Sequence, residues 1–60
     1  MDEQELKTVE AMATYGGSFE KALSYCFLVA DDENFRKLLK AFPEEWKKFG
    51  EMATATEEVP

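Results

Sequence analysis

The stretch from residue 15 to residue 35, YGGSFEKALSYCFLVADDENF, decides the fold of this chain. Two glycines and a serine precede its apolar run, and three acidic residues follow it. Glycine ends helices, serine caps the next one, and acidic residues favour the start of a helix. The pattern predicts a helix from Phe19 to about Ala30, with Gly16 as a left-handed stop for the preceding helix and Ser18 as the cap.

The predicted helix is apolar nearly all round. At about 100° per residue, most of its apolar residues share one broad face: Phe19, Ala22, Leu23, Cys26, Phe27, Val29 and Ala30. The other positions lie opposite: Glu20, Lys21, Ser24, Tyr25 and Leu28. Such a helix is typical of the centre of a bundle. We therefore expect Leu23 and Phe27 to be almost fully buried, and Cys26 to be a buried, unreactive thiol.

A helix is predicted on each side of this segment. The first runs from Asp2 or Glu3 to Tyr15, with a narrow apolar stripe formed by Leu6, Val9, Met12 and Ala13. The other covers about Asp32 to Ala41 and is capped by Asp31 or Asp32. Its inward residues are Phe35, Leu38 and Leu39.

Pro43 divides the C-terminal part of the chain. The residue before a proline is pushed out of helical geometry, whereas proline itself suits a first helical turn. A fourth helix is therefore expected from Pro43 to about Ala53, carrying Trp46, Phe49 and Met52. The alternative is one long helix kinked at Pro43. Residues 54–60 have no apolar period and are expected to be a disordered tail.

The fold class predicted is all-α: a small bundle of three or four short helices around the central apolar helix, with residues 1–53 as one domain. A chain of 60 residues buries only about 60% of its unfolded surface. A single cysteine excludes an internal disulfide, and without histidine the chain lacks the four cysteine or histidine ligands typical of structural zinc. Self-association is the remaining way to stabilise so small a domain, so we expect a homodimer.

The residues offer little catalytic chemistry. No histidine is present for proton transfer near neutral pH, and no serine or cysteine has an evident base partner in the sequence. We expect no enzyme activity, no cofactor and no metal. The acidic N-terminus is unlike a secretory signal, and no apolar run approaches the roughly 20 residues that span a bilayer. With its lone cysteine, the chain is expected to be cytoplasmic, without membrane contact.

Charge is distributed unevenly. Residues 1–33 hold eight acids against two lysines, whereas residues 34–60 hold five acids and five bases. The bases fall within one short segment: Arg36, Lys37, Lys40, Lys47 and Lys48. They are candidate contacts for an anionic ligand, so a small nucleic-acid-associated regulator is the alternative function. The acidic half opposes general nucleic-acid binding, since phosphate neutralisation supplies most non-specific affinity.

Protein binding is the favoured function. Tyr25 and Leu28 lie on the side of the apolar helix away from its main face, and Trp46 lies among charged residues. Large apolar groups in such places mark interfaces, where tyrosine and tryptophan are common anchors. We expect Tyr25 and Leu28, with part of the first helix, at a two-fold interface, and Trp46 as a further anchor.

The segments GGSFEKAL and ADDENFRKLLKAFPEEW carry a resemblance that covers residues 15–49. The chain resembles short bacteriophage and prophage proteins of uncharacterised function that share the pattern GGSF-x-KAL, an AD-x-x-N step, and AFP-x-x-W/Y. That resemblance implies a phage setting, in which small acidic helical proteins inhibit or redirect a host protein, including one of a bacterial defence system. Some inhibitors of this kind imitate the charge of DNA. Here the acids of residues 1–33 are candidates for such mimicry, which the basic segment interrupts.

Overall fold

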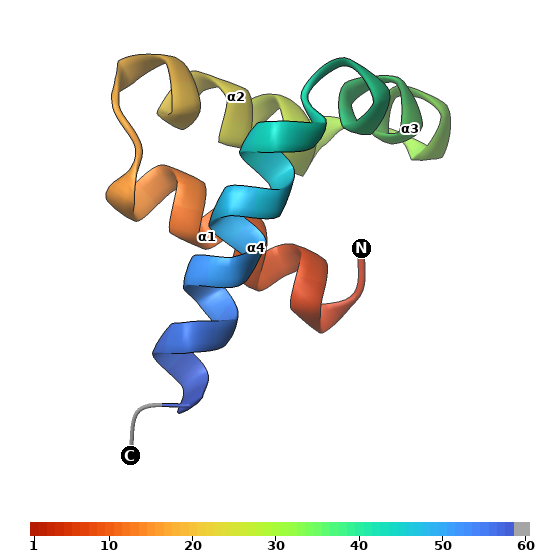
Figure 1. Cartoon of the computed structure of the whole chain (residues 1–60). Helices are drawn as coiled ribbons and strands as arrows, with labels where there is room; N and C mark the ends of the chain where they lie inside the picture. Colours follow the sequence, from red (N-terminus) through yellow and green to blue (C-terminus); the bar gives the residue numbers. More distant parts are fainter. Residues whose placement is uncertain (59–60) are drawn as a thin grey trace.

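Four α-helices account for nearly all of the chain that is described. The computed structural model describes residues 1–58, with side chains through Ala55. In chain order the helices are α1 (Glu3–Tyr15), α2 (Ser18–Val29), α3 (Asp32–Ala41) and α4 (Pro43–Glu58) (Figure 1). Residues 1–58 include no β-strand. The prediction of an all-α fold is therefore confirmed.

Acidic caps begin two of the helices where the sequence indicates. At α1, Asp2 Oδ1 accepts a hydrogen bond from the Glu5 N–H at 2.8 Å, and Glu5 Oε1 accepts one from the Asp2 N–H at 3.0 Å. At α3, Asp31 Oδ1 accepts from the Asn34 N–H at 2.9 Å. Each bond satisfies a backbone donor that has no partner inside its helix. The predicted starts of both helices are confirmed.

The turn between α1 and α2 is built differently from the prediction. Gly16 has extended backbone angles, φ −81° and ψ 166°, so the expected left-handed stop is wrong. Glycine is needed there because a Cβ would clash with Glu20 Cβ and lie 2.6 Å from the Met12 carbonyl oxygen. The cap of α2 is Gly17 rather than Ser18, which is the first helical residue. Glu20 Oε1 accepts from the Gly17 N–H at 2.8 Å, and this bond replaces the predicted serine cap.

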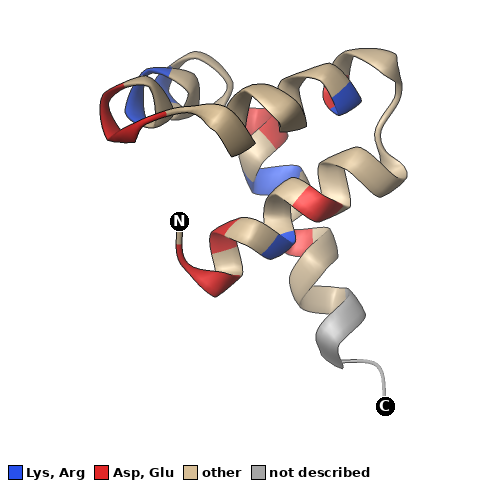
Figure 2. Ribbon diagram, turned by 180° about the vertical axis from the view of Figure 1, so that it is seen from behind, with Lys and Arg blue, Asp and Glu red and all other residues tan. Residues whose placement is uncertain are grey.

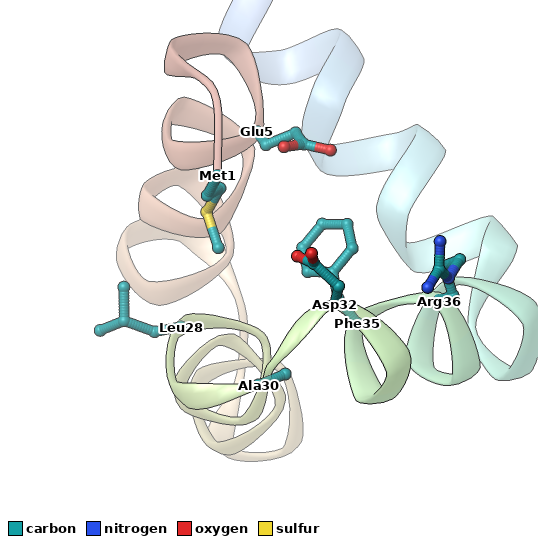
Figure 3. A pocket seen from close by; sticks show the side chains of 7 residues that line it. All are labelled: Met1, Glu5, Leu28, Ala30, Asp32, Phe35 and Arg36. Carbon is teal, nitrogen blue, oxygen red and sulfur yellow. The ribbon is translucent and has the colours of Figure 1, made fainter.

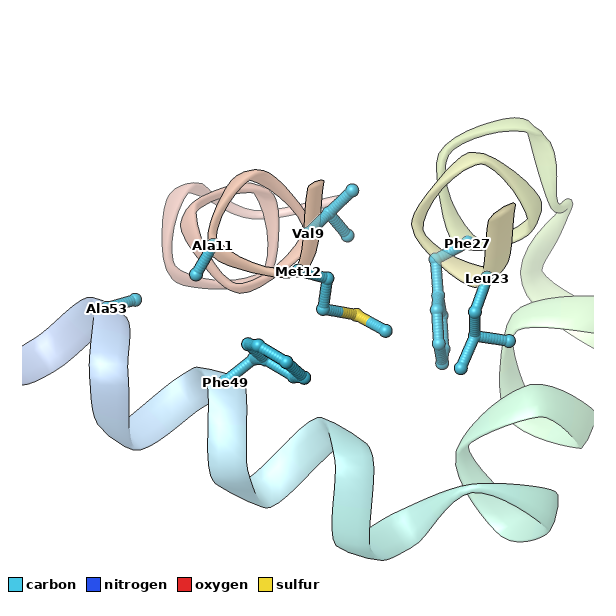
Figure 4. Close-up of a cluster of buried hydrophobic side chains, with 7 residues drawn as sticks. All are labelled: Val9, Ala11, Met12, Leu23, Phe27, Phe49 and Ala53. Carbon is cyan, nitrogen blue, oxygen red and sulfur yellow. The ribbon is translucent and has the colours of Figure 1, made fainter. Parts of the chain in front are cut away.

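Helix α1 packs against both α2 and α4, and the buried core lies where the three meet (Figure 4). Its members are Val9, Ala11, Met12, Leu23, Phe27, Phe49 and Ala53. Leu23 is 5% exposed and Phe27 is fully buried, so both core predictions are confirmed.

The predicted apolar stripe of α1 is only half right. Val9 and Met12 are buried, but Leu6 and Ala13 are exposed. Ala11 and Thr8 are buried instead. Because α1 packs against both α2 and α4, it buries a wider part of its surface than a single apolar stripe. Burial of Thr8 leaves no polar group unpaired, since its Oγ1 donates to the Gln4 carbonyl at 3.0 Å.

Aromatic rings tie α3 and α4 to α2. The Phe27 ring lies 5.5 Å from the Phe35 ring and 4.7 Å from the Trp46 ring, and those two rings are 5.3 Å apart, measured between centroids. Such aromatic contacts add about 0.5–1.5 kcal/mol each beyond the area that they bury. The cluster therefore anchors α3, none of whose residues is fully buried.

The chain breaks between α3 and α4 at the residue before Pro43. Phe42 leaves helical geometry, with φ −130° and ψ 56°, so the predicted break is confirmed over the single kinked helix. Helix α4 continues through Glu58, and the predicted end near Ala53 is therefore wrong. Residues 54–58 of the expected disordered tail belong to this helix, and residues 59–60 lie outside the described part of the chain.

Candidate protein-binding surface

Among the described helices, α2 carries the most exposed large apolar side chains. Four large side chains of this helix are more than half exposed: Tyr25 (65%), Val29 (61%), Phe19 (54%) and Leu28 (54%). The smaller residues Ala22 and Cys26 are also exposed. Isolated exposed apolar residues are ordinary, but a contiguous group of this kind marks a binding surface.

The orientation of α2 differs from the prediction. Cys26 was expected in the core, but its thiol is exposed. Ser24 was placed on the outer side, but it is only 5% exposed. Its Oγ donates to the Lys21 carbonyl oxygen at 2.6 Å, which removes the cost of burying a hydroxyl. The inner face is therefore the arc that holds Leu23, Ser24 and Phe27. The other large apolar residues of α2 are exposed, and the Phe19 ring among them also contacts the Phe42 ring, with 5.6 Å between the centroids.

The N-terminal end of α2 is fastened to α1 by a lysine. Lys21 Nζ donates to the Ala13 carbonyl at 3.0 Å and to the Gly16 carbonyl at 2.9 Å. These carbonyls belong to the C-terminal end of α1, where a positive charge also interacts favourably with the helix dipole. Lys21 is itself exposed, and its two hydrogen bonds hold the start of α2 against the end of α1.

The three predicted anchors have different surroundings. Tyr25 and Leu28 are exposed, as the sequence indicated for a single chain. Trp46 is half-buried, and its ring packs against Phe27 and Phe35 in the core. Tyr25 and Leu28 are thus free to contact a partner, whereas Trp46 chiefly stabilises the fold.

One hollow lies between the start of α1 and the α2–α3 corner (Figure 3). It has a volume of about 240 Å³ and is lined by Met1, Glu5, Leu28, Ala30, Asp32, Phe35 and Arg36. Glu5 is already engaged there, since its carboxylate accepts the Asp2 N–H of the α1 cap. The lining mixes two acids with one base and includes no serine, threonine, cysteine or lysine.

A second hollow opens between α2 and α3. It has a volume of about 460 Å³, and its lining is mainly apolar: Cys26, Val29, Ala30, Leu38 and Ala41, with Asn34 and Lys37. Cys26 and Val29 belong to the exposed face of α2 described above, so the hollow continues that face onto α3. Lys37 is its one charged lining residue.

The five predicted anionic-ligand contacts are all exposed: Arg36, Lys37, Lys40, Lys47 and Lys48. They do not form an uninterrupted basic surface, because acidic residues precede the α3 group and Glu44 and Glu45 separate it from the α4 pair (Figure 2). Lys37 Nζ lies 3.7 Å from Glu33 Oε1, one helical turn earlier. Lys48 Nζ lies 5.3 Å from the centre of the Phe49 ring.

The described residues hold no group of three or more histidine, cysteine or acidic side chains arranged to bind a metal ion. Among the helices described, none has the length and apolar character needed to cross a membrane. Comparisons with protein-family models, with curated proteins and with solved structures found no match to this chain. The exposed apolar face of α2 is therefore the main candidate for a functional surface in the described part of the chain.

Sequence reasoning missed half of this surface. It identified Tyr25 and Leu28 but assigned Phe19, Cys26 and Val29 to the core. The signal in the sequence was an excess of apolar residues on α2, more than one buried face of a helix in a small bundle holds. The excess indicates an exposed apolar face without indicating which residues form it.

Proposed function

We propose that this protein is a small acidic protein-binding module that acts through the outward face of α2. The observation that carries the proposal is the exposure of Tyr25 and Val29, each more than 60% exposed on the same helix. Leaving large apolar side chains in water costs free energy that a partner would recover by covering them. Tyrosine also adds a hydroxyl for a directional hydrogen bond, which suits an interface.

Self-association is part of the proposal. A second copy would cover Tyr25 and Leu28, together with exposed apolar residues of α1 such as Leu6, which is 42% exposed. A two-fold contact buries the same patch from both chains. On this account α2 is central to the dimer, with its inner face in the core of one chain and part of its outer face against the other chain. Association then supplies the stability that a chain of this length lacks.

The biological setting proposed is that of a phage-type modulator or inhibitor in the host cytoplasm, with a host protein as its target. The resemblance carried by GGSFEKAL and ADDENFRKLLKAFPEEW supports this setting. A bacterial defence protein is a fitting target class, because small acidic proteins act on such systems by binding. The exposed apolar face of α2 supplies the contact area for it.

Nucleic-acid binding is less well supported. Helix α3 carries Asp32 and Glu33 in its first turn, where a helix entering a DNA groove would meet phosphates. The net charge of −6 opposes association with a polyanion. The exposed bases are better explained as a balance to neighbouring acids, as in the Glu33–Lys37 pair.

Affinity capture with matched variants tests the protein-binding proposal. Wild-type protein, the double variant Tyr25→Ser/Val29→Ser and the control Tyr15→Ser are used to capture proteins from a bacterial lysate. Tyr15 is a suitable control because it is an aromatic residue exposed to a similar extent, 57%, but it belongs to α1 rather than to α2. We expect a host protein that binds the wild type and the control but not the double variant. Equal capture by all three proteins would contradict the proposal.

A further inference from the structure

We propose that the groove between α2 and α3 receives one amphipathic helix of the partner, and that this helix carries acidic residues along its flanks. The inference rests on the protein-binding function proposed above and adds the place and the chemistry of the contact. The groove is the hollow of about 460 Å³ lined by Cys26, Val29, Ala30, Asn34, Lys37, Leu38 and Ala41.

The dimensions of the groove suit a helix. Its α3 wall runs from Asn34 to Ala41, and the seven helical steps between these residues cover roughly 10 Å. The anchors i, i+4 and i+7 of an amphipathic helix span the same roughly 10 Å. On the α2 wall, Cys26 and Val29 are spaced by three residues, and Ala22 and Phe19 continue the exposed apolar face toward the start of the helix.

A helix is also the backbone form that this surface accepts best. Both walls of the groove are helices, whose backbone groups are paired within themselves. A peptide that binds by strand addition needs a sheet edge, and residues 1–58 contain no strand. Over an apolar floor its amides would lose water without a replacement. A helix brings its own hydrogen bonds and presents only side chains.

The charge of Lys37 indicates which charged residues the partner helix should carry. Among the described residues that line the groove, Lys37 is the one that carries a charge, and its ammonium lies 3.7 Å from Glu33 Oε1 with both side chains more than two-thirds exposed. Such an exposed pair contributes little, so Lys37 can exchange Glu33 for a carboxylate of an incoming helix at small cost. A second copy of this chain fits the groove poorly. A two-fold contact centred there would bring both Lys37 ammonium groups to one interface, where like charges repel.

Two designed peptides test the inference. Both are helices of about four turns locked by a side-chain staple, with leucine at i, i+4, i+7 and i+11. One has glutamate on its flanks and the other has lysine. Binding to the protein is followed by fluorescence anisotropy of the labelled peptide. The net charge of −6 favours the lysine peptide in any non-specific association, so a preference for the glutamate peptide has to come from the local surface.

The reaction of Cys26 with a thiol reagent provides a second readout, because this thiol lines the groove. At a concentration about ten times its Kd, the glutamate peptide should slow the reaction by about tenfold. The variant Lys37→Glu should weaken the binding of the glutamate peptide by about fivefold or more. The control Lys47→Glu makes the same charge change on α4, outside the groove, and should have a much smaller effect. Far-UV circular dichroism verifies that both variants are folded.

Several results would overturn the inference: equal binding of the two peptides, equal effects of the two lysine variants, or an unchanged rate at Cys26 with the glutamate peptide bound. None of these results bears on the captured host protein. If capture still depends on Tyr25 and Val29 while the peptide test fails, the partner binds α2 without entering the groove. If capture shows no such dependence, the protein-binding proposal itself fails.

Discussion

The inner and outer faces of α2 are made of similar residues, and only one of them is covered. Phe27 on the inner face is fully buried, whereas Tyr25, two residues earlier, is 65% exposed. The difference arises from the neighbours: α1, α3 and α4 all supply contacts to the inner face, and no described residue covers the outer one to the same extent. Apolar character alone therefore does not say which side of a helix stabilises the fold and which side is left for a partner.

The largest effect should come from a substitution on the inner face. Phe27→Ala removes the ring that meets both Phe35 and Trp46, and should cost about 3–5 kcal/mol, enough to unfold a domain of this size. Tyr25→Ala on the outer face should change the free energy of unfolding by less than about 0.5 kcal/mol in dilute solution. Urea unfolding measures both. A cooperative Phe27→Ala variant with the stability of the wild type would break the comparison.

A smaller effect should appear at the turn that orients α2. Gly16→Ala would drive a Cβ against backbone and against Glu20 Cβ, and should destabilise the protein by about 1–3 kcal/mol. Gly17→Ala is the matched control, because its Cβ would meet only the end of the flexible Glu20 side chain at 3.2 Å. It should cost less than about 1 kcal/mol. If thermal unfolding ranks the two variants in the opposite order, the turn does not fix the orientation of α2.

The smallest effect, and the one of opposite sign, should come from the packed side of α4. An alanine at Gly50 would place its Cβ 3.5 Å from Thr8 Oγ1, an ordinary van der Waals contact. Gly50→Ala should therefore stabilise the protein by up to about 1 kcal/mol through helix propensity. The measurement is the urea midpoint. A clear loss of stability would mean that α1 and α4 approach each other more closely than described.

The starts of α1, α3 and α4 could be predicted because their signals are local. Asp2, Asp31 and Pro43 each set a helix start through a bond or a ring within a few residues. The orientation of α2 could not be predicted in this way, because apolar residues lie all around it and the choice of inner face depends on tertiary contacts. Ser24 can be buried because its hydroxyl donates to the Lys21 carbonyl, but any helical serine can make this local bond, so it does not mark the inner face. Because the face that holds Ser24 is the inner one, Cys26 and Val29 are exposed. The groove beside α3, which both residues line, could therefore not be predicted either.

The extent of α4 illustrates a second limit. The run of threonine and alanine after Met52 has no apolar period, yet the helix includes residues 53–58. Ala53 is buried against α1, and Gln4 Nε2 donates to Thr54 Oγ1 at 3.4 Å. Contacts with α1 thus favour a helix that the local pattern does not indicate. Such contacts join residues about 50 positions apart in sequence, which a local reading does not detect.

The reactivity of Cys26 tests most directly whether the apolar face of α2 points outward. The thiol is exposed on that face, so in dilute native protein it should react with a thiol reagent at a rate within about tenfold of the urea-unfolded chain. Labelling followed by mass spectrometry at several times measures both rates. Reaction that occurs only after unfolding would place Cys26 in the core. It would reverse the two faces of α2 and remove the surface on which the proposed function rests.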